Sequence, residues 1–184
     1  MTSASTIIAD VRSPIPPFLQ NGGECGALLR EIDWHHHPLG PPDKWPRQLQ
    51  TIVSIILGSR QPMYVCWGPD DHTIYNDDYA ALCGDRHPKG MATPFAKIWF
   101  DIMHLIRDMI AQVKAGKSVH VDQLEVLMHR KGYPEEAHFS FSYTPVRDDH
   151  NDVVGLFCAC AEITEQVMLR RELQHERGQL AQMF

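Results

Sequence analysis

Histidines are the residues of this sequence with the most obvious capacity for chemistry, since 11 of its 184 residues are histidine and His35, His36 and His37 are consecutive. Imidazole nitrogens are common ligands of transition metals. A metal site also needs side chains that converge from a rigid frame with supporting hydrogen bonds. The three histidines lie between a tryptophan and Pro38, in a loop where neighbouring side chains diverge. The pattern therefore favours a polar loop, and we expect no metal site.

Thiols offer a second possible metal-binding chemistry. The chain has five cysteines, at positions 25, 66, 83, 158 and 160, and none of them forms a Cys-x-x-Cys pair. Cys158 and Cys160 would lie on one face of a strand, because side chains alternate along a strand. Two thiols alone do not make a structural zinc site, so we interpret both as small buried residues. The odd number of cysteines indicates reduced thiols, which are typical of a cytoplasmic protein.

Paired carboxylates could serve general acid–base catalysis, but their positions here have a simpler explanation. Four neighbouring pairs fall in predicted turns or at predicted helix starts, where acidic residues have local roles. They are Asp70 and Asp71, Asp77 and Asp78, Glu135 and Glu136, and Asp148 and Asp149. The sequence contains no glycine-rich phosphate loop and no nucleophile elbow. We therefore expect no catalytic residues and a non-enzymatic domain.

The composition argues against several classes of partner. With 17 basic and 23 acidic side chains the formal charge is −6, and no basic patch is visible. We therefore expect neither nucleic acid nor an anionic membrane surface as a partner. The longest strongly apolar stretch, Val153–Ala161, is far shorter than the roughly 20 residues that a membrane-spanning helix needs. The first residues have no apolar signal core, and we expect a cytoplasmic location.

Hydrophobic periodicity and turn residues predict the elements that position these side chains. The expected helices cover residues 24–33, 43–58, 76–82, 94–115 and 165–184. The expected strands cover residues 63–67, 73–75, 118–128, 137–146 and 153–163. Asp43 is the expected N-cap of the second helix, and Gly58 its C-terminal stop. In strand 137–146 strict alternation predicts that Phe139, Phe141 and Tyr143 face a core while their neighbours face water.

The last predicted helix carries a seam of apolar residues at heptad-like spacing. The seam consists of Leu169, Leu173, Leu180 and Met183. A seam of fewer than three heptads is marginally stable alone. We therefore expect it to pack in a homodimer or to continue in a longer natural protein.

The order of these elements resembles that of the PAS sensor domain, over about residues 60–165. The segment Tyr75–Tyr79 looks like the turn between a strand and a helix in that family. Val154–Phe157, leading into Glu162–Glu165, looks like its closing Asp-Ile-Thr motif, with Glu162 where aspartate is usual. In the family this motif carries a side-chain bridge that ties the last strand to the outgoing helix.

Further segments are similar to one N-terminal PAS subfamily, which heads bacterial sensor histidine kinases. These segments are Asp33–Trp34, Pro38–Pro41, Trp45–Pro46, Trp67–Pro69, Gly132–Glu136 and Phe139–Pro145. The resemblance implies an α+β fold, with a five-stranded antiparallel sheet flanked by helices. It also implies four regions: a flexible lead-in at 1–23, a helical cap at 24–60, a PAS core at 61–164 and a signalling helix at 165–184.

The function implied by the resemblance is a non-catalytic sensory input domain of a larger bacterial protein. In a two-component system this would be a sensor histidine kinase with its effector domain in the same polypeptide. A change at a ligand cavity or dimer interface would pass through a hinge of Glu162, Ile163 and Thr164 to the C-terminal helix. Such a helix can shift between two packings.

Two cofactors known in the family are disfavoured by the residues present. Haem-binding members hold the iron through a histidine on the long helix, where this chain has only His104. Taking Ile102 as zero at the helical period, His104 falls about 200° round, opposite the apolar face. The cysteinyl-flavin photoreceptors carry an Asn-Cys-Arg-Phe motif, whereas the corresponding stretch, Gly84–Met91, contains no cysteine.

The ligand cavity of the fold is the remaining candidate site, with a small molecule as its possible occupant. Its expected lining residues are Met63, Val65, Trp67, Tyr75, Trp99, Leu124, Val126, Phe139, Phe141 and Phe157. An aromatic and aliphatic stripe of this kind is also what an ordinary filled core requires. Two alternatives therefore stay open: a haem- or flavin-binding sensor, and a dimerisation module without a ligand.

Overall fold

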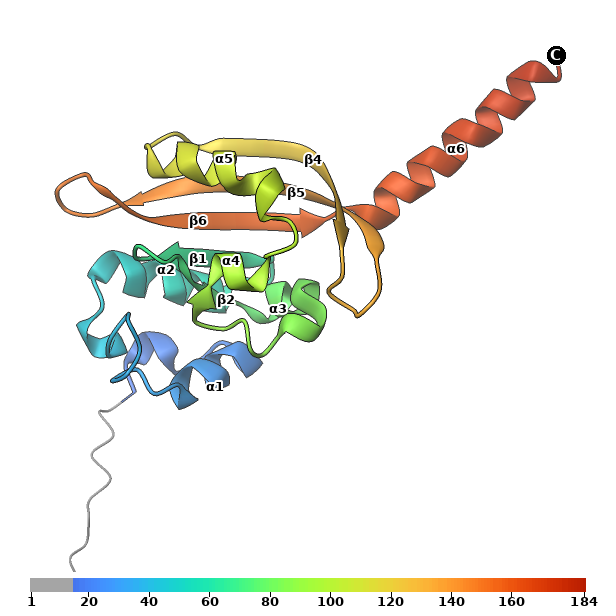
Figure 1. Cartoon of the computed structure of the whole chain (residues 1–184). Helices are drawn as coiled ribbons and strands as arrows, with labels where there is room; N and C mark the ends of the chain where they lie inside the picture. The colour runs from blue at the N-terminus through green and yellow to red at the C-terminus, as the bar shows by residue number, and fades with distance from the viewer. Residues whose placement is uncertain (1–14) are drawn as a thin grey trace, which may run out of the picture.

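The computed structural model describes residues 15–184, and its central feature is a six-stranded antiparallel sheet (Figure 1). The strands are β1 (Met63–Trp67), β2 (His72–Tyr75), β3 (Thr93–Pro94), β4 (Val119–Met128), β5 (Glu135–Arg147) and β6 (Val153–Glu162). They lie in the order β3-β2-β1-β6-β5-β4. The α+β fold expected from the sequence is confirmed. The five expected strands are all present, and the two-residue β3 is the addition.

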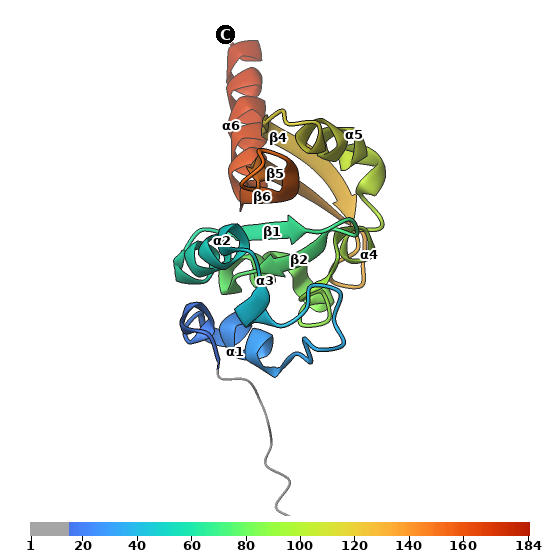
Figure 2. The ribbon, with the colours of Figure 1, turned by 90° about the vertical axis from the view of Figure 1, so that its left-hand side faces the viewer.

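Helices flank this sheet and extend beyond it. They are α1 (Gly23–Glu31), α2 (Arg47–Gly58), α3 (Asp77–Cys83), α4 (Phe95–Ile98), α5 (Met103–Lys114) and α6 (Thr164–Gln182). Three short 3-10 segments lie at Pro17–Leu19, Pro42–Lys44 and Gly84–Arg86. Figure 2 shows α1 and α6 at opposite ends of the molecule. No helix of the described residues is long and apolar enough to span a bilayer.

The predicted helix 94–115 is two helices with a break at Trp99–Ile102. The break has a tertiary cause: the Arg86 guanidinium, from another segment, donates to the Ile98 carbonyl at 2.9 Å. It also forms a two-pronged ion pair with Asp101, at 2.8 and 2.7 Å. These contacts hold the chain in a non-helical path, and Trp99 turns inward as a result.

The N-terminal cap is tied to the core by side chains that act across the sequence. The Asp77 carboxylate, at the start of α3, accepts the backbone N–H groups of Glu24 and Cys25 at 3.1 and 2.7 Å. It therefore caps the N-terminus of α1 from a distant helix. Asp43 lies in a 3-10 segment and does not cap α2, whose N-cap position is Pro46.

Part of the segment expected to be a flexible lead-in, residues 1–23, has a defined structure. Residues 1–14 lie outside the described residues, but Pro17–Leu19 is ordered as a 3-10 segment. The Leu19 side chain is buried in the core cluster. Its carbonyl also accepts a hydrogen bond from the Arg30 guanidinium at 2.7 Å. The cap consequently begins several residues before position 24.

The outer face of β5 is more buried than the predicted alternation requires. Phe141 and Tyr143 are buried, as expected, and Phe139 is half-buried. His138 is fully buried, although the alternation predicts a face near water. The reason is that α6 begins beside this end of β5, where the His138 backbone N–H donates to the Thr164 hydroxyl at 3.0 Å. The start of the helix thus covers one end of the outer face.

Candidate functional site

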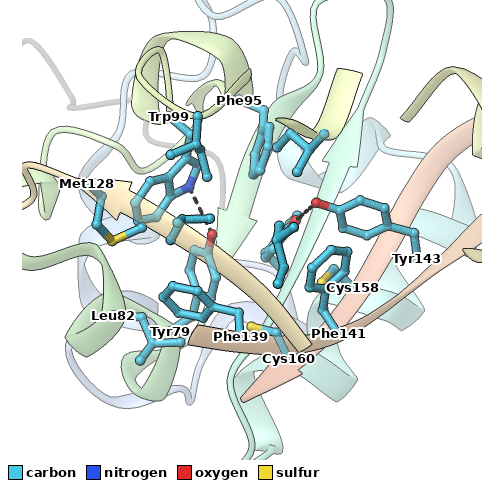
Figure 3. Close-up of a pocket in the computed structure, with 15 residues that line it drawn as sticks. Tyr79, Leu82, Phe95, Trp99, Met128, Phe139, Phe141, Tyr143, Cys158 and Cys160 are labelled. Carbon is cyan, nitrogen blue, oxygen red and sulfur yellow. Dashed lines mark hydrogen bonds between the residues drawn. The ribbon is translucent and has the colours of Figure 1, made fainter. Parts of the chain in front are cut away.

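An apolar cavity lies between the sheet and the α4–α5 segment (Figure 3). Its volume is about 60 Å³. Five of the ten residues expected to line it do so: Trp99, Leu124, Val126, Phe139 and Phe141. They come from the helix break and from the inner faces of β4 and β5. The periodicity of these elements therefore predicts the correct face.

The prediction of which β1 side chains face the cavity is wrong. Tyr64 lines the cavity, whereas Met63, Val65 and Trp67 do not. Because side chains alternate along a strand, these three point to the opposite face. That face is also covered, since Val65 is fully buried there and α2 packs against β1. Because both faces of this strand are buried, no alternation of polar and apolar residues shows which side chains face the cavity.

Tyr75 and Phe157 also lie off the cavity. Tyr75 is fully buried, and its hydroxyl shares a hydrogen bond with His87 Nδ1 at 2.8 Å. Phe157 points away from the cavity, which β6 lines instead with Cys158 and Cys160. The largest side chain of this central strand, Phe157, thus faces away from the cavity, so size was a poor guide to the inner face. The expectation that both cysteines share a buried face is met.

Several lining residues were absent from the expected set. They are Tyr64, Tyr79, Leu82, Phe95, Ile102, Ile106, Met128, Tyr143, Cys158 and Cys160. A sequence signal existed for some of them: Phe95, Ile102 and Ile106 belong to the apolar face of residues 94–115, and Tyr143 alternates with Phe141. Tyr79 has no such signal, because α3 is too short for a clear period.

The tyrosine hydroxyls of the cavity stay protonated. Burial raises the pKa of Tyr64, Tyr79 and Tyr143 well above the ordinary value of 10. Burial likewise raises the pKa of the Cys158 thiol. The Trp99 indole donates to the Tyr79 oxygen at 2.9 Å, as Figure 3 shows. The Tyr79 proton has no acceptor among the described residues, and it remains available to a guest.

The junction between β6 and α6, where we expect a hinge, is built around Glu162. Its carboxylate pairs with the Arg130 guanidinium at 2.9 Å and accepts the Thr164 hydroxyl at 2.8 Å. Arg130 is almost fully buried, and it also bonds Glu135 at 2.7 Å and the Leu82 carbonyl at 2.9 Å. The glutamate thus makes a side-chain bridge between the last strand and the β4–β5 turn.

One group of possible metal ligands occurs in the described residues. Glu125, Glu136 and His138 place one ligand atom each within 4.8 Å of one another. The Arg171 guanidinium of α6 already lies against these carboxylates, at 2.6 Å from Glu136 and 3.8 Å from Glu125. Both carboxylates of this group are therefore already paired with a cationic side chain.

His104 of α5 is exposed, as the helical spacing predicts.

Comparison with known families gives the fold its name. A family model described as the PAS fold matches residues 59–168. The chain belongs to the PAS family. PAS domains are in general non-catalytic sensory modules, so this chain is a signal-sensing input domain. The match includes the cavity, the junction at Glu162 and the start of α6.

Solved structures agree on the fold of this PAS domain. The PAS domain of Bordetella pertussis BvgS is 21% identical, with a TM-score of 0.53 over 73% of this chain and 99% of that one. An RNA-binding light-oxygen-voltage receptor is 16% identical, with a TM-score of 0.51. The similarity covers 72% of this chain but only 37% of that receptor. A search of curated proteins finds no match.

The hydrogen-bonded Glu162 carboxylate makes the stability of the PAS domain depend on pH. Burial raises the pKa of the Glu162 carboxyl, but the bonds from Arg130 and Thr164 outweigh it and leave the pKa below its ordinary 4.5. A carboxyl with a lowered pKa contributes stability above its unfolded pKa and loses it as the pH falls through the folded value. We therefore expect Glu162→Gln to lower the free energy of unfolding by about 1–2 kcal/mol at neutral pH and by less near pH ~3.

Urea denaturation at the two pH values measures this difference. Glu172→Gln is the matched control, because Glu172 is exposed on α6 and forms no ion pair among the described residues. Its effect should be small at both pH values. An equal loss of stability at both pH values in Glu162→Gln would show that the charge of Glu162 contributes nothing.

Proposed function

We propose that this PAS domain is the ligand-sensing input module of a larger cytoplasmic bacterial signalling protein, a sensor histidine kinase of a two-component system. Its effector domain would belong to the same polypeptide. The observation that carries the sensing role is the cavity: a largely apolar pocket with an unused hydroxyl donor, lying beside the strand that leads to α6.

The lining residues indicate the chemical class of the ligand. The cavity is lined by aromatic and aliphatic side chains, by two cysteines and by tyrosine hydroxyls that stay protonated, and no acidic or basic side chain lines it. Transfer of an ion into such a space without a partner is strongly unfavourable. We expect a small, uncharged and largely apolar molecule with one hydrogen-bond acceptor for Tyr79.

The path from cavity to output runs along β6. Cys158 and Cys160 line the cavity, Glu162 follows on the same strand, and α6 begins at Thr164. A ligand that shifts the inner face of β6 therefore acts on a strand joined directly to Glu162, Ile163 and Thr164. Val167 is the one buried residue of α6, so little packing resists a change in the direction of the helix.

The exposed seam of α6 supports a homodimer. Leu169, Leu173, Leu180 and Met183 are each more than half exposed. Pairing two copies along this seam would bury these side chains. Analytical ultracentrifugation tests this part: we expect a dimer that Leu173→Lys weakens at least tenfold. If the unsubstituted protein stays monomeric at high concentration, the proposed homodimer is contradicted.

Mass spectrometry tests the sensing role. The intact protein, sprayed under native conditions after purification from its host, should carry an additional small mass that denaturation releases. An absorption spectrum of the same sample reveals haem or flavin, the alternative cofactors. The small cavity favours a second candidate, the ligand-free dimerisation module. Native and denatured masses that agree, together with no binding of added neutral compounds, would support that module and contradict the sensor.

A further inference from the structure

Three aromatic side chains divide the interior of the PAS domain. Tyr64, Phe95 and Tyr143 line the cavity described above, and they also line a second one of about 40 Å³. The second cavity lies under α5, against Met103 and Ile110. The two cavities are therefore neighbours, and these three rings form the wall between them.

Strand register explains the position of the wall. Tyr64 of β1 and Tyr143 of β5 both pair with Cys158 of β6, which lies between them. Residues paired across adjacent strands point to the same face of a sheet. The two long tyrosines consequently reach over the short Cys158 side chain, and their hydroxyls meet. The next row along the same face contains Cys66 and Leu156, which line the second cavity.

The hydrogen bond that joins the two tyrosines of this wall is weak. The Tyr64 hydroxyl donates to the Tyr143 oxygen at 3.2 Å, beyond the usual 2.5–3.0 Å range of hydroxyl–oxygen bonds. Phe95 stacks on the Tyr64 ring at 5.2 Å between centroids and supports it from the helix side. The Tyr143 proton has no acceptor among the described residues. Parting the two rings therefore breaks one long hydrogen bond and no other side-chain hydrogen bond among the described residues.

We propose that the Tyr64–Tyr143 bridge over Cys158 limits the length of the ligand, and that opening it adds the second cavity to the binding site. This inference rests on the proposed sensing function. Short ligands occupy the first cavity alone, while a longer apolar tail must part the two tyrosines. Such a tail would extend towards the end of the sheet where Asp71, which lines the second cavity, pairs with Lys114 at 2.6 Å.

A series of straight-chain methyl ketones, from four to nine carbon atoms, tests the proposal. Their carbonyl oxygen accepts a hydrogen bond from a tyrosine hydroxyl, and their tails differ only in length. In the parent protein, calorimetry should show affinity rising by about fourfold per methylene group until the first cavity is filled and then levelling off. In Tyr143→Leu, which shortens the wall, the rise should continue for at least two more methylene groups.

Two further variants keep the test decisive. Tyr143→Phe retains the buried ring and removes only the bridge, so it should extend the rise by at least one methylene group even if Tyr143→Leu fails to fold. Tyr133→Phe is the matched control, because Tyr133 is exposed and lines neither cavity. It should level off at the same length as the parent.

The outcomes separate the two hypotheses. Binding that levels off at the same length in the parent and in Tyr143→Phe would overturn the role of the bridge and leave the sensing function intact. If affinity for the unsubstituted protein rises along the whole ketone series, the role of the bridge is likewise overturned and the sensing function stays intact. No binding of any ketone to any folded variant would overturn both the bridge and the proposed ligand class.

Discussion

Replacing Arg130 by methionine is expected to lower the free energy of unfolding by about 3–5 kcal/mol, the usual effect of removing one partner from a buried ion pair. Arg130 is only 3% exposed, and its guanidinium bonds Glu135, Glu162 and the Leu82 carbonyl. Methionine fills much of the same volume but donates no hydrogen bond. The two carboxylates and the carbonyl would then be left in a largely buried place without their donor.

Chemical denaturation at neutral pH measures this loss, with Lys131→Met as the matched control. Lys131 also pairs with Glu135, at 3.7 Å, but its side chain is half exposed. Exposed ion pairs contribute only about 0–1 kcal/mol, so the control should change stability little. Adding Glu162→Gln to Arg130→Met should recover part of the loss, because it removes one unpaired charge. Similar small losses in Arg130→Met and Lys131→Met would contradict the structural role of the buried bridge.

The same substitution should loosen the start of α6. Glu162 also accepts the Thr164 hydroxyl, which in turn accepts the His138 backbone N–H. Loss of Arg130 frees the glutamate and so weakens the contact between β5 and the first turn of α6. Hydrogen exchange in Arg130→Met should therefore become faster at Val167 and its neighbours than in Lys131→Met.

Asn76→Ala is expected to lower the free energy of unfolding by about 3 kcal/mol. The Asn76 side chain is buried, and its oxygen accepts the backbone N–H groups of Tyr79 and Met63 at 3.0 and 3.3 Å. Loss of an N-cap alone costs about 1 kcal/mol. The amide nitrogen also donates to backbone carbonyls at the end of α2 and in the following loop, as near as 2.8 Å to Gln61. Each buried group left without a partner adds to the cost.

Two comparisons isolate the causes of that effect. Asn76→Asp keeps the capping oxygen but directs a carboxylate at those carbonyls, so it should also be destabilising at neutral pH and less so in acid. Asn21→Ala is the control, since Asn21 is exposed and its side chain forms no hydrogen bond among the described residues. A thermal melt detects all three changes. Equal melting temperatures for Asn76→Ala and Asn21→Ala would contradict the role assigned to Asn76.

Local signals in the sequence predicted much of this fold. Helical spacing placed His104 opposite the apolar face, and strict alternation placed Phe139 and Phe141 on the inner face of β5. These predictions succeed because one side of each element faces a core and the other does not, so polarity records the orientation. The segment Tyr75–Tyr79 predicted a strand followed by a capped helix for a similar reason: a cap acts within three residues.

Other features were decided only by the tertiary structure. The phase of β1 was not visible, because both of its faces are buried, and the break before α5 depends on Arg86 from another segment. His138 is buried because α6 begins beside it, 26 residues further along the chain. Sequence patterns thus determined the elements and the polarity of their half-exposed faces. The tertiary structure determined which long-range partners meet, because those contacts join residues that no local period connects.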